Sequence, residues 1–457
     1  MVQGTFKLLE LVDRAQTGQL IDNTEFEQKL IPAKLKELVK QYDITRDPAV
    51  LIPFDNNLAD NVFKAAYEFL LDVGVYCAET GRIIKITDED LKEALKLLPE
   101  STIIGAGQER RELKPRTIGD TRPIIVTGPV EGNSTSANYL NILTSIAMEP
   151  DVDILCCGSL LDIDGRPILA HSPIEIHAAL REASWMRQAI TKAGRPGLCM
   201  IGAGFEWVGS DIASFNPEHG FRPTDCGCPS MISPMRTTLN QLTRAQFLLD
   251  CGRPMQAFSD QLIGGFTGGA EGTVVSSVAH ILASLVLYQA NFQTVNCQHL
   301  HYSSVSNRLS IWCHNLAAQA LVRNTRIIPT SEGHSSGAPC TDMLLYEAAA
   351  VALCVVSGMN LGPGPCGRAT KGIDTYTGLE VRLFAKTGKA YAGMKRENAN
   401  DLASQLVKKY EDKFQNPPAG KPFNECYDAR TMTPSQEWAD IYNKVTMTLE
   451  DLGVNLT

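Results

Sequence analysis

Apolar and polar residues follow helical spacing in the first part of the chain. Up to about residue 115, apolar positions recur every three to four residues with charged residues between them, the pattern of amphipathic helices. The spacing predicts helices over 30–42, 59–73 and 88–98. Thr87 and Asp90 form the sequence pattern of a capping box at the start of the third helix. We therefore expect residues 1–115 to form a helical extension.

From residue 116 the pattern changes to short apolar runs that alternate with longer helical segments. Strands are predicted over 124–127, 153–157, 198–201, 255–258, 294–302 and 326–329. Helices are predicted over 173–193, 237–251, 273–288, 308–324, 341–356 and 378–414. Such alternation is typical of parallel strands joined by right-handed crossovers.

The repeats number about eight and no linker interrupts them, which favours a closed barrel over an open doubly wound sheet. The predicted fold is therefore α/β, with a (β/α)8 TIM-type barrel over residues 116–415. The stretch 416–420 (NPPAG) breaks the chain before a C-terminal helical tail, 416–457. With 457 residues and 44% hydrophobic content, the three parts have enough apolar surface to form one structural unit.

Composition narrows the class of protein. The net charge of -9 leaves no basic face for nucleic acid. The longest apolar run, 348–359, is shorter than the roughly 20 residues that span a bilayer, and the N-terminus has no signal-peptide pattern. Thirteen cysteines without framework spacing are typical of reduced thiols inside a cell. We expect a cytoplasmic enzyme that contacts neither nucleic acid nor membrane.

The stretch 194–207 (GRPGLCMIGAGFEW) ends a predicted strand in Gly202-Ala203-Gly204. A dinucleotide-binding loop would open a helix at these glycines and place an acidic residue about 20 positions later, and neither feature is present. In a barrel, the loops after the strands form the mouth of the active site. Phe205, Glu206 and Trp207 are therefore candidate substrate-binding residues.

Two other predicted strand ends are rich in polar residues. Asp260 precedes the glycine-rich run 264–269, whose amides either bind an anion at the next helix or simply let the loop bend. Glu332 and His334 form a pair that suits proton transfer or cation binding, or else a hydrogen-bonded loop. Glu332, His334 and Asp260 are the candidate catalytic residues.

A third strand end offers both metal ligands and an aromatic ring. The period of two places Cys297, His299 and His301 on one face, and a thiolate with two imidazoles suits zinc. Because same-face neighbours lie about 7 Å apart, the three converge only with distortion. Tyr302, like Phe205 and Trp207, either packs or presents a ring to an alkylammonium group beside Asp260, Glu206 and Glu332.

Several stretches in the same order match one family along nearly the whole chain. They are FKA (63–65), VYC (75–77), GRPG (194–197), GGFTGGAE (264–271), PCTDM (339–343), AGKPFNECYD (419–428) and LEDLG (449–453). The chain resembles the monomethylamine methyltransferases, barrel enzymes that pass a methyl group from methylamine to a small corrinoid protein. The resemblance implies a corrinoid protein as partner, a small methyl donor, no tightly bound cofactor and a homo-oligomer.

The resemblance also marks a departure from the family pattern. Just after GRPG the family contains pyrrolysine, whose imine ring is thought to hold and activate the amine. That position falls on Ile201, or on Ala203 if the loop has gained two residues. Neither side chain is electrophilic, and no residue here is an obvious substitute.

Neighbouring positions of the family site differ too. Asp260 matches a family carboxylate if one gap is allowed, and His299 matches a family histidine. Glu332 stands for a glutamine, His334 for a tyrosine and His301 for another basic residue. An altered but still polar set indicates changed specificity rather than decay.

Three functions remain open from the sequence. The first is a corrinoid-protein methyltransferase without pyrrolysine that uses a betaine-like quaternary amine or another methylamine. A quaternary donor needs positioning and charge but no activation. The second is a zinc-dependent methyltransferase with Cys297, His299 and His301 as ligands. The third is a non-catalytic paralogue that keeps the barrel.

Overall fold

Eight parallel segments close into a barrel in the described part of the chain. The computed structural model describes residues 3–129, 132–202, 204–216, 218, 220–368 and 371–456. The principal barrel strands are β6 (Ile154–Cys156), β10 (Cys199–Gly202), β11 (Cys226–Gly227), β14 (Gln256–Ile263), β15 (Phe292–His299) and β16 (Pro329–Ser331). Every pairing between neighbours among them is parallel, including the bridge from Gly227 to Met255 that joins β11 to β14. The short β12 (Ser230–Met231) extends β11 and pairs with β14.

Two segments complete the ring by single bridges rather than as full strands. Thr127 bridges Ile154 of β6, Asn360 bridges Thr330 of β16, and Val126 bridges Leu361 to close the circle. The strand expected over 124–127 is thus reduced to bridges in the structure. The predicted (β/α)8 barrel is confirmed.

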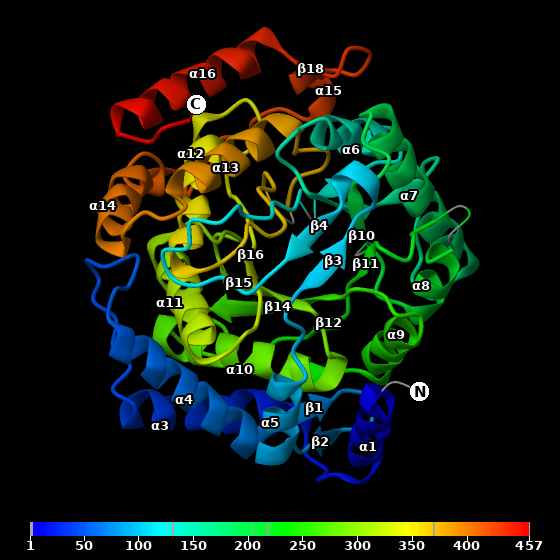
Figure 1. Cartoon of the computed structure of the whole chain (residues 1–457), viewed down its shortest axis with the longest axis vertical. Helices are drawn as coiled ribbons and strands as arrows, with labels where there is room; N and C mark the ends of the chain where they lie inside the picture. Colours follow the sequence, from blue (N-terminus) through cyan, green and yellow to red (C-terminus); the bar gives the residue numbers. More distant parts are fainter. Residues whose placement is uncertain are drawn as a thin grey trace.

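A helix follows each barrel segment, as Figure 1 shows around the central strands. In chain order they are α6 (Tyr139–Ala147), α7 (Pro173–Lys192), α8 (Val208–Ser214), α9 (Leu239–Asp250), α10 (Ala270–Tyr288), α11 (Arg308–Asn324), α12 (Asp342–Val351) and α13 (Gly378–Tyr391). Short strands β5 (Asn133–Ser134), β7 (Ser159–Leu160), β8 (Asp162–Ile163) and β9 (Arg166–Pro167) lie in the loops on either side of α6 and β6.

The N-terminal residues pack against one side of the barrel. They form α1 (Gln3–Thr17), α3 (Ile31–Gln41), α4 (Asn56–Val73), β1 (Val75–Cys77), β2 (Arg82–Ile84) and α5 (Asp88–Lys96). Helix α4 packs on α10 and α11, and β1 pairs in parallel with β13 (Arg236–Thr237). The capping box is confirmed, since Thr87 N donates to Asp90 Oδ2 at 2.8 Å and Asp90 N donates to Thr87 Oγ1 at 3.2 Å.

Helix α10 is the one described helix that is long and apolar enough to cross a membrane. It lies between β14 and the covering helix α4, and 89% of its most apolar window is buried. Its apolar composition is therefore explained by packing on both sides, as in a core helix.

The last predicted helix is wrong. The helix expected over 378–414 is divided into α13 and α14 (Arg396–Val407), because the chain turns at Gly393, where φ is +84°. The tail then forms α15 (Phe423–Cys426), a hairpin of β17 (Tyr427–Asp428) and β18 (Thr433–Pro434), and α16 (Gln436–Asp451), which packs on α12.

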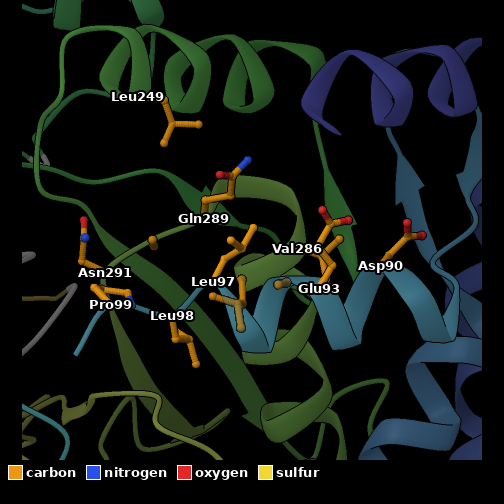
Figure 2. A pocket seen from close by; sticks show the side chains of 12 residues that line it. Asp90, Glu93, Leu97, Leu98, Pro99, Leu249, Val286, Gln289 and Asn291 are labelled. Carbon is orange, nitrogen blue, oxygen red and sulfur yellow. The ribbon is translucent and has the colours of Figure 1, made fainter. Parts of the chain in front are cut away.

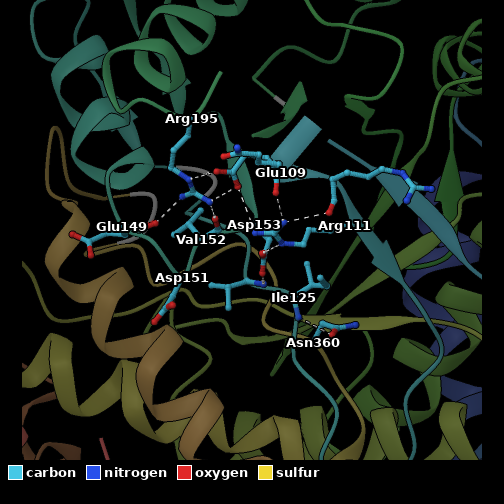
Figure 3. Close-up of polar contacts among 12 residues, drawn as sticks. Glu109, Arg111, Ile125, Glu149, Asp151, Val152, Asp153, Arg195 and Asn360 are labelled. Carbon is cyan, nitrogen blue, oxygen red and sulfur yellow. Dashed lines mark hydrogen bonds and ion pairs between the residues drawn. The ribbon is translucent and has the colours of Figure 1, made fainter. Parts of the chain in front are cut away.

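The end of the barrel where the strands begin is closed by a hairpin of β3 (Thr102–Ile104) and β4 (Arg111–Leu113). Ala106 N donates to Gly197 O at 2.9 Å, just before β10 begins. Arg195 of the GRPG motif fixes this end, as Figure 3 shows. It donates to Glu109 Oε1 at 2.9 Å, to Glu149 O at 2.8 Å and to Val152 O at 2.6 Å. The GRPG motif therefore stabilises the closed end of the barrel. The opposite end, where the strands finish, is the mouth.

Candidate functional site

A cavity of about 250 Å³ opens at the mouth, where the strands end. Its walls come from four consecutive strand ends, those of β6, β10, β11–β12 and β14. The lining residues are Cys157, Gly158, Ser159, Gly204, Glu206, Ser230, Met231, Ile232, Ser233, Phe258 and Asp260. This is where a (β/α)8 barrel binds its substrate.

Asp260 enters this cavity because of strand alternation. Its neighbours in β14, Ser259 and Gln261, hydrogen-bond to side chains of α10 on the outer face of the strand. Asp260 faces inward, and its Oδ1 accepts a hydrogen bond from Asn296 Nδ2 at 2.7 Å, directly opposite in β15. With the exposed Glu206 also lining it, the cavity has two acidic side chains and no basic one among its lining residues. Such a site suits a cation.

The two glycines of the loop after β10 make room for other side chains. A side chain on Gly202 would begin 2.6 Å from the Phe221 ring, and one on Gly204 would begin 2.1 Å from Glu182 Oε1. A side chain at either position would therefore displace the Phe221 ring or the Glu182 carboxyl group. The packing of Phe221 and Glu182 therefore explains the two glycines, which the sequence analysis had already judged not to be a dinucleotide-binding loop.

The candidate residues around these glycines differ in position. Ile201 is fully buried inside the barrel and is not among the cavity-lining residues, and Ala203 lies outside the described residues. Phe205 is half-buried against the core, and Trp207 caps α8 with its ring 5.6 Å from that of His171. Of this group, the structure brings Glu206 to the cavity beside Asp260.

Glu332 and His334 are paired but lie apart from the cavity-lining residues. Glu332 follows β16 directly, and its Oε1 lies 3.0 Å from His334 Nε2, with both side chains buried. The segment 363–366 holds this loop in place, because Gly333 N donates to Pro363 O at 2.9 Å and Cys366 N donates to Gly333 O at 2.8 Å. Burial and the neighbouring His334 lower the pKa of His314 to about 3.

His299, His301 and Tyr302 belong to another part of the mouth. The Tyr302 ring stacks on His299 at 4.2 Å and on Phe414 at 4.9 Å. His301 and Tyr302 line a separate rim pocket of about 160 Å³ that also contains Arg368 and Lys371. Burial, and then the charge of His301, lower the pKa of His299. These residues do not reach Asp260's cavity.

The three residues of the zinc alternative are not grouped in the structure. Cys297 is fully buried and its thiol interacts with Cys313 of α11, so it faces the helix layer. β15 ends at His299, and the chain turns before His301. Among the described residues, no three His, Cys, Asp or Glu side chains are grouped to hold a metal ion. The expectation of a shared ligand face at Cys297, His299 and His301 is therefore wrong.

One buried group at the mouth was missed from the sequence. Glu182 of α7 accepts a hydrogen bond from Tyr139 Oη at 2.9 Å, and burial raises its pKa to about 8. The helical spacing of Ala178, Glu182 and Met186 places all three on one buried face, and that spacing was the available signal.

A further cavity of about 230 Å³ lies away from the mouth. Figure 2 shows it between α5 and the ends of α9 and α10, next to Asn291, which precedes β15. Because active sites of such barrels lie at the carboxyl ends of the strands, this cavity is not the site of chemistry.

Comparison with known proteins decides the family. The family described as monomethylamine methyltransferase MtmB matches residues 6–454. The chain belongs to this family. It is 28% identical to monomethylamine methyltransferase MtmB1 of Methanosarcina acetivorans, with 98% of each chain covered. It is also 28% identical to MtmB3 of Methanosarcina barkeri, at the same coverage.

Solved MtmB structures have the same fold. The crystal structure of Methanosarcina barkeri MtmB covers 98% of each chain with a TM-score of 0.95 at 27% identity. The hydroxylamine MtmB complex gives the same values. The barrel of this chain is therefore the MtmB barrel.

Proposed function

We propose that this chain transfers a methyl group from a small N-methylated cation to the Co(I) corrinoid of a separate corrinoid protein, and does so without pyrrolysine. The observation that supports this most directly is the position of Asp260, whose carboxylate faces the mouth cavity of an MtmB barrel with Glu206 nearby. The corrinoid protein then docks over the mouth, and its cobalt is the nucleophile.

The acidic cavity explains how a donor is held without pyrrolysine. A quaternary ammonium already has a good leaving group, so it needs orientation and charge rather than covalent activation. A betaine-like donor therefore fits best, with Asp260 and Glu206 facing its cationic end. Glu332 and His334, buried two strand ends beyond Asp260, act from outside the cavity lining in this proposal, and the rings of Phe205, Trp207 and Tyr302 act from the rim.

The experiment combines the purified protein with a reduced Co(I) corrinoid protein and a panel of N-methyl compounds. Glycine betaine, sarcosine and methylamine are each supplied in turn, and the cobalt absorbance reports methyl-Co(III). Methylation by the quaternary compound supports the proposal. No methylation by any donor would favour the non-catalytic paralogue, and zinc at one equivalent per chain would return the zinc-dependent enzyme to consideration.

A further inference from the structure

A buried carboxyl group from the helix layer reaches the wall of the mouth cavity. Glu182 is only 2% exposed, and its Oε1 accepts the hydrogen bond from Tyr139 Oη at 2.9 Å. Tyr139 lies in α6 and is also fully buried, with its ring 5.8 Å from that of Trp185. Two neighbouring helices thus fix one carboxyl group behind β6 and β10.

Two residues connect Glu182 to the cavity. Gly204 lines the cavity, and the Glu182 carboxyl group occupies the space that a side chain on Gly204 would fill. Cys157 also lines the cavity, and its thiol is hydrogen-bonded to the Glu182 carboxyl group. A proton on Glu182 is therefore one hydrogen bond away from a group that faces the substrate.

The surroundings keep that proton in place at neutral pH. Burial raises the pKa of Glu182 to about 8, against the opposing effect of the hydrogen bonds from Tyr139 and Cys157. Asp211 of α8 raises it further, while itself bound to Arg244 with Nε to Oδ2 at 2.7 Å. Burial holds the pKa of Tyr139 well above its usual value, so the phenol stays a neutral donor.

We propose that Glu182 is a positioning residue that supplies, through the Cys157 thiol, the proton taken up by the departing amine. As the cobalt–carbon bond forms and the carbon–nitrogen bond breaks, the nitrogen keeps the bonding electron pair. It takes the proton of the Cys157 thiol, and the thiolate takes the proton of Glu182, which stays a carboxylate until the ammonium product leaves and is then protonated again from solvent. The proposal rests on the proposed function.

Protonation makes the transfer one-way. A free amine is a nucleophile that can take the methyl group back, whereas an ammonium ion has no free electron pair. Asp260 is poorly suited to this task, because its Oδ1 accepts the hydrogen bond from Asn296 and a carboxylate there serves to bind the cation.

Glu182→Gln tests the role, because glutamine has the shape and neutrality of the protonated acid but no proton to give. We expect KM for glycine betaine to stay within about threefold and kcat to fall about 100-fold, the usual contribution of a positioned proton donor. The wild-type kcat falls as pH rises through about 8, where Glu182 loses its proton, and the variant lacks this decline. Cys157→Ala lowers kcat in the same way.

Glu380→Gln is the matched control. Glu380 of α13 is equally buried and burial also raises its pKa to about 8, but it does not line the mouth cavity. Its variant keeps kcat and the decline above pH 8. Equal kcat in Glu182→Gln and wild type would overturn the proposal while leaving the proposed function intact.

Calorimetry with N,N-dimethylglycine, the amine that glycine betaine leaves, gives a readout without turnover. Binding of this ammonium product at pH 7 releases close to one proton from the wild type, because Glu182 is then a carboxylate, and none from Glu182→Gln. Equal release in both proteins would refute the role of Glu182. Absence of both amine binding and turnover in the wild type would overturn the proposed function, and this proposal with it.

Discussion

His334 Nε2 lies 3.0 Å from Glu332 Oε1, with both side chains buried beyond the end of β16. The two form an ion pair when the imidazole is protonated, and removing one member of a buried ion pair leaves the other without compensation, at a cost of about 3–5 kcal/mol. We therefore expect Glu332→Ala and His334→Ala each to lower the free energy of unfolding by about 3 kcal/mol. The double variant costs less than the sum, with a coupling energy of about 1–3 kcal/mol measured by urea unfolding.

An exposed pair provides the control for this cycle. Arg323 Nη2 lies 2.7 Å from Asp60 Oδ2, but the two side chains are 28% and 29% exposed. Solvent screening limits the coupling of such a pair to below about 1 kcal/mol. If the Glu332–His334 coupling were no larger, the two side chains would not form an ion pair in the folded protein.

Asp260→Asn separates charge from shape in the mouth cavity. Asparagine keeps the size of the side chain and an oxygen for Asn296, but it removes the negative charge that faces the donor. At about 4 Å, opposite charges near a protein surface attract by about 4 kcal/mol. We expect KM for a quaternary donor to rise at least about tenfold, since only part of this attraction survives desolvation.

The matched control for Asp260→Asn is Asp342→Asn at the start of α12. Asp342 is about half exposed and pairs with Lys413 at 3.0 Å, away from the cavity-lining residues. Its variant should keep the wild-type KM. An unchanged KM in Asp260→Asn as well would show that the donor cation does not contact this carboxylate.

The barrel was predictable because strand and helix periods differ so clearly in this sequence. The helix expected over 308–324 is α11 with the same bounds, and strand 198–201 differs from β10 by one residue at each end. Of the two closing segments, 124–127 was predicted as a strand, whereas the segment at Asn360, which forms single bridges, was not. The division at Gly393 depends on a left-handed glycine inside an otherwise helical pattern.

The candidate site was predictable only in part. The strand pattern shows which residues share a face of one strand, but it does not show which side chains from different elements come close together. Asp260 was a candidate because it follows the strand expected over 255–258, and the period of two along 297–301 does not show that β15 ends at His299 or that Cys297 faces α11. Glu182 comes from the helix layer, and its approach to Gly204 joins positions that are 22 apart along the chain (204 minus 182). Only the packed structure brings them together.

Stability should fall as pH rises from about 6 to about 8.5. Burial raises the pKa values of Glu182 and Glu380 to about 8 and that of Glu347 to about 7, so the folded protein retains protons that the unfolded chain has lost. Their contribution is complete below the unfolded pKa of about 4.3 and is lost as pH rises to about 8. Burial lowers the pKa values of His280 and His314 to about 4 and 3, which destabilises the fold as pH falls below about 6.5.

Urea unfolding at several pH values checks this dependence. The free energy of unfolding should decrease from pH 6 to pH 8.5, and Glu380→Gln should make that decrease smaller because glutamine does not ionise. A wild-type curve that is flat over this interval would mean that these carboxyl groups are already ionised in the folded protein.

Mild oxidation should join Cys340 to Cys426. Their sulfur atoms lie 3.3 Å apart, which links the loop before α12 to the C-terminal tail. Cys340 is half-buried, and its hydrogen bond with Cys426, opposed by burial and helped by Lys421, lowers the pKa of its thiol. A thiolate attacks disulfides, so a low-molecular-weight disulfide added in excess takes the two electrons and the two thiols lose their protons.

Peptide mapping by mass spectrometry should find the cross-linked peptides with two hydrogens fewer, and Cys340→Ser should abolish them. The cross-link closes a loop between positions 86 apart, which raises the free energy of unfolding by up to about 4 kcal/mol in the chain-entropy account. Cys251, which is exposed on the far end of α9, should form only mixed disulfides with the reagent and serves as the internal control. Oxidant-treated protein in which Cys340 carries the reagent while Cys426 stays a thiol would show that the two sulfur atoms do not approach each other in solution.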